Sequence, residues 1–295
     1  MRDRRGEVAV LGATGQQGSA VVRALSAAGA PVRALVRRPE AAADLVGLPG
    51  VRAVHADTDD AASLREAFTG VRALFVMTVF AARGPAGEVA QGRAVVDAAA
   101  AAQVPQLVYS SVGGAERRSG VPHFESKWTV EEHLRASGLP AVVVRPVFFM
   151  ENFLQSMAPV REGDNLVLRA PLRPRTPLQL ISAEDVGVIS ATLLQHPGLV
   201  PAGAVEVAGD DLGPEQVAER LGRRHGLVGR FEPTPVEAVD DEDFRAMFGW
   251  LARPPAYQGD LLLTRQLHPG VLDFAAFLAA GHRYPSTRTR TEEPT

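Results

Sequence analysis

Short apolar runs alternate with longer helical patterns through the first half of the chain. The runs occupy residues 7–12, 31–37, 51–57, 71–78, 105–111 and 139–146. Each is rich in β-branched residues or leucine, which is typical of parallel strands buried on both faces. Amphipathic or alanine-rich segments, such as 16–29 and 88–103, lie between them. Right-handed crossovers stack such βαβ units into a doubly wound, Rossmann-type parallel sheet, so we expect an α/β fold.

The rhythm of strands and helices changes after Pro146. The pattern then predicts a short helix at 148–157, a proline-rich loop with extended pieces at 169–180, a helix capped by Ser182 at 182–196, one more strand at 204–209 and a mostly helical region from Gly213 onward. A smaller second part therefore follows the parallel sheet.

Composition narrows the function classes. The 295 residues carry a formal net charge of −3 and include no cysteine. A slightly acidic chain does not attract nucleic acid or anionic lipid, and a chain without cysteine has no disulfide, thiolate metal site or cysteine nucleophile. No apolar run is long enough for a membrane, and the seven histidines show no paired metal-ligand spacing. We expect a cytoplasmic protein that binds neither metal, membrane nor nucleic acid.

The first strand leads into a glycine-rich turn. Gly12, Gly15 and Gly18 are spaced G-x-x-G-x-x-G between that strand and the first helix. A tight turn, close approach to a pyrophosphate and close helix packing each favour a residue without Cβ. Such a triplet can also be a simple turn, but its position in a βαβ unit favours dinucleotide binding. The expected phosphate-binding residues are Gly12, Thr14, Gly15, Gln16, Gln17 and Gly18.

The end of the second strand indicates which dinucleotide is bound. NAD sites usually carry an acidic residue there, whereas a 2′-phosphate favours arginine. Arg37 and Arg38 occupy this position, and a planar guanidinium can bind a phosphate through two hydrogen bonds. The alternative is two solvated arginines. We expect NADP(H) rather than NAD.

Polar residues also close the third and fourth strands. Asp57 is placed to accept from the adenine amino group, with Thr58 beside it, and Thr78, Val79 and Phe80 are placed to cover the ribose. Each of these residues can equally be a polar or apolar strand end.

These observations divide the chain into two parts. We expect a dinucleotide-binding domain over residues 1–151 and a smaller, mostly helical part over 152–285 that binds a substrate or a partner. Part of 177–207 is expected to return to the sheet, and the polar residues 286–295 are expected to be a disordered tail. Ligands bind at the carboxyl edge of open α/β sheets, which the second part would cover.

Several stretches resemble the NmrA-like family of atypical short-chain dehydrogenases/reductases. They are residues 10–18, 34–40, 55–60, 123–146 and 148–153. The resemblance implies a Rossmann fold that prefers NADP. It also implies one of two functions, because some members reduce quinones or related conjugated carbonyls with NADPH, while others are regulators that bind the dinucleotide without obvious turnover.

The segment HFESK, residues 123–127, is where this sequence departs from the catalytic members. In those members a tyrosine that donates a proton precedes a lysine by four positions, and the lysine holds the nicotinamide ribose. Lys127 keeps the lysine's place, but His123 occupies the tyrosine's. On a helix the two side chains share one face. An imidazole is a competent acid or base, yet His123 can equally be a helix-start residue bonded to the backbone.

The resemblance also implies contacts near the nicotinamide. Ser110 and Ser111 end the fifth strand, where a hydroxyl faces substrate or nicotinamide, and Pro146, Phe149 and Asn152 follow the sixth strand. We therefore expect Lys127, His123 and Ser111 to be the catalytic residues.

Two hypotheses remain open. The first is an NADPH-dependent oxidoreductase that reduces a quinone or related conjugated carbonyl under an apolar lid formed by Phe148, Phe149, Met150, Phe153 and Trp250. The second is a non-catalytic NADP(H) sensor that binds a protein partner, and a homodimer fits either reading.

Overall fold

The computed structural model describes residues 6–80, 83–200 and 203–281. The predicted tail, residues 286–295, lies outside the described residues. Among those described, no helix is both long and apolar enough to cross a bilayer.

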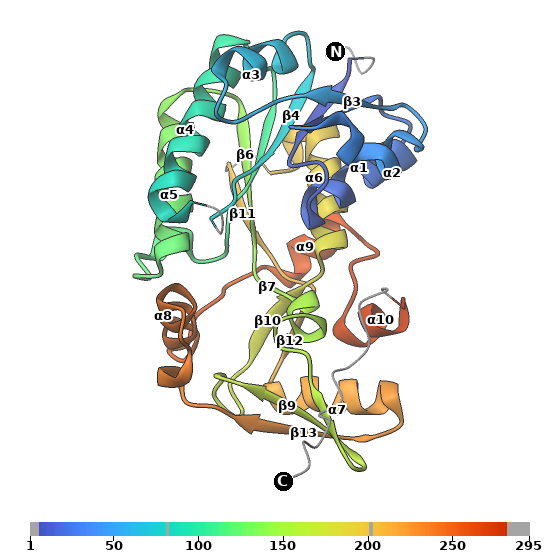
Figure 1. Cartoon of the computed structure of the whole chain (residues 1–295), viewed down its shortest axis with the longest axis vertical. Coiled ribbons are helices and arrows are strands. Elements are labelled where there is room, and N and C mark those ends of the chain that lie inside the picture. The colour runs from blue at the N-terminus through green and yellow to red at the C-terminus, as the bar shows by residue number, and fades with distance from the viewer. Residues whose placement is uncertain (1–5, 81–82, 201–202, 282–295) are drawn as a thin grey trace.

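A seven-stranded sheet forms the first part (Figure 1). Its strands, in spatial order, are β3 (Val51–His55), β2 (Val32–Val36), β1 (Val8–Leu11), β4 (Ala73–Met77), β5 (Leu107–Ser110), β6 (Ala141–Pro146) and β11 (Ala204–Val207). Every neighbouring pair is parallel. The strand order reverses between β1 and β4, which is the position where doubly wound folds bind ligands. The Rossmann-type fold predicted from the sequence is confirmed.

Helices cover both faces of this sheet (Figure 1). One face carries α1 (Gln16–Ala27), α2 (Ala43–Val46) and α6 (Ala183–Gln195), and the other carries α3 (Ala61–Phe68), α4 (Gly84–Ala101) and α5 (Pro122–Ala136). Short 3-10 turns connect elements at Pro39–Ala42 (η1), Ala115–Arg117 (η2) and Pro197–Leu199 (η4). Ser182 caps α6 as predicted, because its hydroxyl accepts from the Asp185 N–H at 3.0 Å.

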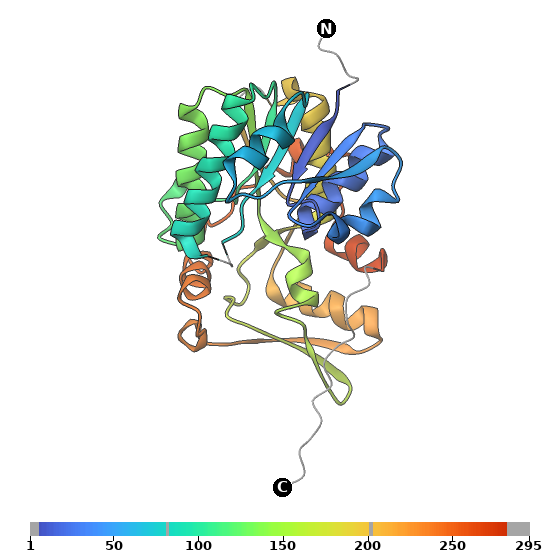
Figure 2. The same cartoon turned by 45° about the horizontal axis from the view of Figure 1, so that its top comes forward.

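The second part lies below the carboxyl edge of the sheet (Figures 1 and 2). It contains one sheet of β7 (Phe148–Phe149), β10 (Leu178–Ile181) and β12 (Asp210–Leu212), and another of β8 (Val160–Glu162), β9 (Asn165–Ala170) and β13 (Val228–Pro233). Its helical elements are η3 (Met150–Leu154), α7 (Pro214–His225), η5 (Val236–Ala238), α8 (Glu242–Leu251) and α10 (Phe274–Ala279), while α9 (Leu261–Leu267) packs against α6 and β11. The region from Gly213 onward is mostly helical, and extended pieces were expected at 169–180, but the two small sheets were not predicted.

Helices α1 and α6 approach each other unusually closely. A Cβ added at Gly187 of α6 would lie 2.5 Å from the Cβ of Ala20 and 2.7 Å from its carbonyl carbon. Neither neighbour is the free end of a flexible side chain, so the helices would have to separate. This contact fixes α1, and with it the glycine turn, against the sheet.

Glu151 lies where the chain passes from the sheet into the second part. Its side chain is 3 % exposed. One carboxylate oxygen accepts from the Ala183 N–H at 2.9 Å, and the other has no hydrogen-bond partner among the described residues. Burial raises the pKa of Glu151 to about 7, and the nearby carboxylates of Asp185 and Glu184 act in the same direction. The joint between the two parts therefore contains a carboxyl group that titrates near neutrality.

The first prediction concerns the contact between α1 and α6. Gly187→Ala should lower the free energy of unfolding by about 1–3 kcal/mol, because the added methyl group overpacks the helix interface. Gly249→Ala in α8 is the matched control, since no atom outside its own helix backbone and chain neighbours lies within 4 Å of the added carbon. The control should be neutral or stabilising by about 0.5–1 kcal/mol. Urea unfolding of both variants measures the difference, and equal stability of the two would contradict the packing argument.

The second prediction concerns Glu151. Between pH 4.5 and about 7 the folded state keeps a proton that the unfolded chain releases. The free energy of unfolding should therefore fall as pH rises through this window. Glu151→Gln removes the titration, so at pH 8 the variant should be more stable than the wild type by on the order of 2 kcal/mol, with little difference at pH 4.5. Denaturant unfolding from pH 4.5 to 8 measures both, and parallel pH curves for the two proteins would refute the assignment.

Candidate active site

The geometry of the turn after β1 requires glycine at two positions, Gly12 and Gly18. Gly12 adopts a φ of +71°, in the left-handed region. The Gly15 N–H donates to the Gly12 carbonyl at 3.0 Å, and a Cβ on Gly18 would lie 2.1 Å from that same oxygen. Because α1 begins at Gln16, its unpaired N–H groups point toward the end of β1. The turn has the geometry of an anion-binding site.

A first cavity of about 340 Å³ lies over the ends of β1 to β4. The predicted residues that line it are Gly12, Thr14, Gly15, Arg37, Thr58, Thr78 and Val79. Leu11, Leu35, Met77 and Val95 provide apolar walls. The cavity thus combines an apolar space with the backbone of the glycine turn at one end and the guanidinium group of Arg37 in its wall.

Several predicted residues, among them Gly18 and Phe80, do not line this cavity. Arg38 and Gln16 are exposed and do not line it. The carboxylate of Asp57 accepts from the Asp59 N–H at 3.0 Å, in the turn before α3. Asp59 lines the cavity instead and forms an ion pair with Arg83, another residue that sequence reasoning missed. The acidic run at 57–60 was the signal, but sequence alone did not show which carboxylate faces inward.

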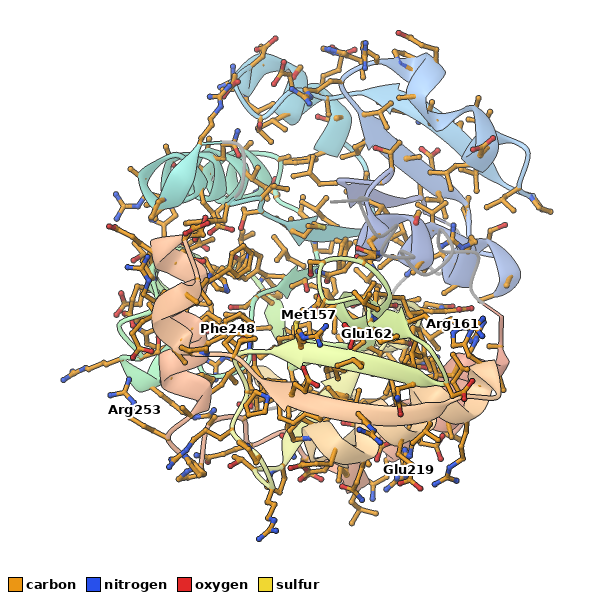
Figure 3. All side chains as sticks on the ribbon, turned by 60° about the horizontal axis from the view of Figure 1, so that its bottom comes forward. Met157, Arg161, Glu162, Glu219, Phe248 and Arg253 are labelled. Carbon is orange, nitrogen blue, oxygen red and sulfur yellow. The ribbon has the colours of Figure 1, made fainter. Side chains whose placement is uncertain are left out.

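A second cavity of about 510 Å³ lies between the ends of β5 and β6, helix α5 and the second part. Gln17, Ser111, His123, Lys127, Pro146, Phe149 and Asn152 are the predicted residues that line it. The rest of the wall includes one charged side chain, that of Arg169, and five aromatic side chains, those of Phe124, Phe148, Phe244, Phe248 and Tyr257. Figure 3 shows Phe248 and one further wall residue, Met157, from the side of the second part. The cavity suits a flat, conjugated molecule.

Two predicted residues support this cavity without lining it. Ser110 is buried and donates to the side-chain oxygen of Gln17 at 2.6 Å, which holds Gln17 toward the cavity. The ring of Phe80 lies 5.7 Å from the ring of His123. Ser111 lines the cavity, and its buried hydroxyl has no hydrogen-bond partner among the described residues.

The predicted lid is correct only in part. Phe148 and Phe149 line the second cavity, whereas Met150 and Phe153 are fully buried in the core of the second part. Trp250 is also buried and packs edge-on against Tyr257 with ring centroids 5.2 Å apart. None of these three residues lines the cavity, and the ring of Trp250 packs against Phe124 of α5 while that of Phe153 packs against Phe274 of α10.

Lys127 is held by a buried carboxylate. Its Nζ lies 2.7 Å from Oε1 of Glu88 on α4 and donates to the carbonyl oxygen of Thr78 at 3.2 Å. The Thr78 hydroxyl donates to the same Glu88 oxygen at 2.7 Å, so the Tyr109 phenol, 3.0 Å away, must donate to Thr78. The protein itself thus occupies most of the ammonium group's hydrogen-bonding capacity.

The charge state of Glu88 follows from its surroundings. Burial pushes the pKa of Glu88 upward, but the Lys127 ammonium and the hydrogen bonds from Lys127 and two hydroxyl groups outweigh burial and lower the pKa. Both members of the pair are therefore charged. Glu88 was not predicted as a site residue. Its spacing was nevertheless a signal, because it lies four residues before Gly92 and seven before Val95, on the buried stripe of α4.

His123 is held by a carboxylate from the second part. Nδ1 of its ring lies 2.5 Å from Oδ2 of Asp243, and its backbone N–H donates to Oδ1 of the same carboxylate at 2.9 Å. The ring of His123 is thus bonded to a side chain and not to the backbone. With Nδ1 engaged, Nε2 is the ring nitrogen left for a ligand in the cavity. No group of three or more histidine, aspartate or glutamate side chains within the described ranges could hold a metal ion.

Comparison with known proteins identifies the family of this chain. The model of the NmrA-like family matches residues 4–254. A relative from Streptomyces griseus, (4-alkanoyl-5-oxo-2,5-dihydrofuran-3-yl)methyl phosphate reductase, is 34% identical over 79% of this chain and 78% of its own.

Two solved structures share the fold. NmrA, a negative transcriptional regulator, in complex with NADP has a TM-score of 0.80 at 23% identity and covers 94% of this chain and 95% of its own. An NADPH-dependent quinone oxidoreductase from Escherichia coli, complexed with NADPH, has a TM-score of 0.77 at 23% identity and covers 93% and 98%. The extent of the family match, together with the Streptomyces relative, shows that the chain belongs to the NmrA-like family.

Proposed function

We propose that this protein is an NADPH-dependent oxidoreductase that reduces a quinone or a related conjugated carbonyl by hydride transfer. The observation that carries the proposal is the pair of cavities on either side of the glycine turn. One has the shape and donors for a phosphorylated adenosine, and the other is lined by aromatic rings and a free hydroxyl. A cofactor bridging the two would place its reactive end among the aromatic side chains.

NADP(H) fits the first cavity better than NAD(H). Arg37 lines that cavity at the end of β2, where a carboxylate would favour an unphosphorylated ribose. The backbone N–H groups at the start of α1 are placed for the pyrophosphate. Solved structures with the same fold contain NADP or NADPH and support binding of NADP(H), but NmrA has also been solved with NAD, so the choice between the two rests on Arg37.

The second cavity has the groups that a reductase needs. When bound, NADPH supplies a hydride from its nicotinamide ring. The free hydroxyl of Ser111 is placed to donate a hydrogen bond to an acceptor oxygen, and His123 to supply the proton. Lys127 lines the same cavity, but its ammonium group is paired with the Glu88 carboxylate, so the pair presents N–H donors to the site and no net charge.

The chemistry of a conjugated acceptor explains how the missing tyrosine is tolerated. Reduction of a quinone restores aromaticity and leaves a weakly basic oxygen, so less help from an acid is needed than for a simple ketone. The Streptomyces relative is named for an acceptor that is also a conjugated carbonyl, an unsaturated lactone.

A non-catalytic NADP(H) sensor that binds a protein partner is the second candidate. The engagement of Lys127 by Glu88 favours it, because a lysine bound by protein groups is less available to a ribose. A sensor must bind NADP and NAD with different affinities and change its affinity for the partner accordingly. If a bound dinucleotide changes neither the conformation of the protein nor its affinity for the partner, this second candidate function is wrong.

The third prediction tests the cofactor choice. Arg37→Ala should weaken NADPH binding roughly 10- to 100-fold, because a charge-assisted hydrogen bond to phosphate is lost, and should leave NADH binding nearly unchanged. Arg38→Ala is the control, since Arg38 is equally exposed but lies outside the cavity. Fluorescence titration with both dinucleotides measures the four affinities. An Arg37 variant that loses NADPH and NADH equally would contradict the assignment.

The fourth prediction tests turnover. The wild type should oxidise NADPH, followed by its absorbance, with at least one member of a panel of quinones and other conjugated carbonyls. His123→Ala should lower kcat by about 10²-fold or more. If the NADPH absorbance stays constant with every acceptor in the panel, the proposed reductase activity is contradicted.

Lys127 needs a paired variant in that experiment. Lys127→Ala alone leaves the buried Glu88 carboxylate without its partner, at a cost of about 3–5 kcal/mol in stability. The double variant Glu88→Gln/Lys127→Ala removes both charges and isolates the effect on turnover. If the double variant folds and keeps the wild-type kcat, Lys127 has no part in the chemistry.

A further inference from the structure

Asp243 is a buried carboxylate that the sequence hypotheses did not use. It lies in the first turn of α8 and is 7 % exposed. Both of its oxygens contact one residue, since Oδ1 accepts from the backbone N–H of His123 and Oδ2 lies 2.5 Å from Nδ1 of its ring. Two contacts to one residue fix both the start of α5 and the orientation of the ring.

The carboxylate also fixes which ring nitrogen carries a proton. A carboxylate accepts hydrogen bonds, so Nδ1 of His123 is the donor and keeps its proton in both the neutral and the charged ring. Nε2 is then the nitrogen that gains and loses a proton. The rings of Phe124, 4.6 Å away, and Phe80, 5.7 Å away, confine the imidazole on its other sides.

The nearest basic group along α5 does not compete for this carboxylate. Lys127 lies one turn further along the same helix, and its ammonium is bound to Glu88 on α4. Each basic side chain of the cavity wall on α5 therefore has its own buried carboxylate, one from the first part and one from the second.

We propose that Asp243 is a positioning residue that holds His123 so that Nε2 delivers the proton to the oxygen of the acceptor. The inference rests on the proposed reductase function. The hydride carries two electrons from NADPH to the acceptor, which leaves NADP⁺. The acceptor oxygen gains the proton from Nε2, the O–H bond forms as the N–H bond breaks, and the neutral ring takes a new proton from water. For a quinone, one NADPH and one proton yield one hydroquinone and one NADP⁺.

The location of Asp243 has a structural consequence. His123 belongs to α5 of the first part, and Asp243 belongs to α8 of the second part. The proton donor is complete only when α8 packs against α5, so the second part provides both the cavity wall and the orientation of the donor.

The fifth prediction compares two variants in the first turn of α8. Asp243→Asn keeps an oxygen for the His123 N–H but presents an NH₂ group to Nδ1, which favours the opposite tautomer. We expect kcat to fall by on the order of 10²-fold, with acceptor KM and NADPH affinity within about two-fold of the wild type, because only the proton transfer is impaired. Glu242→Gln makes the same charge change at an exposed position and should behave as the wild type.

Nitrogen NMR of the imidazole gives a readout that does not depend on turnover. The His123 signals, assigned by their loss in His123→Gln, should show a neutral ring protonated on Nδ1 in the wild type and on Nε2 in Asp243→Asn. A wild-type ring protonated on Nε2 overturns the inference whatever the activity. Wild-type kcat in Asp243→Asn overturns it while leaving the reductase function intact. Absence of turnover in the wild type overturns the proposed function, and proton delivery with it.

Discussion

The site depends on how closely the backbone of α1 can approach the end of β1. At Gly18 no side chain of any size fits, because its place is filled by the carbonyl of Gly12. That approach turns the first N–H groups of α1 toward the carboxyl edge of the sheet, where the strand order reverses. Gly187 completes the arrangement by allowing α6 to pack tightly against α1 from behind. The close approach of the two backbones, without any side-chain group, thus creates the geometry of the anion-binding turn.

Around that constraint, the two parts of the molecule contribute different kinds of interaction. The first part provides fixed dipoles, Arg37 and the buried pair of Lys127 and Glu88. The second part provides aromatic surface and the carboxylate of Asp243. The second cavity therefore lies between a polar wall and an apolar wall, an arrangement that can orient a ligand as well as bury it.

The sequence predicted what local patterns determine. The strands, the glycine turn and the Ser182 cap depend on neighbours a few residues away, and all three are present. The partners of Lys127 and His123 were missed because Glu88 and Asp243 are 39 and 120 positions away along the chain. Each carboxylate does lie on the buried stripe of its helix, a signal that something must pair with it. The small sheets of the second part gave weaker signals, since their strands are short and several are largely exposed.

The most direct test of the account is a crystal structure of the protein with NADPH bound. The account predicts the pyrophosphate at the start of α1, the 2′-phosphate within reach of Arg37, and the nicotinamide in the aromatic cavity with His123 and Ser111 beside it. A dinucleotide bound elsewhere, or no bound dinucleotide at saturating concentration, would contradict the account.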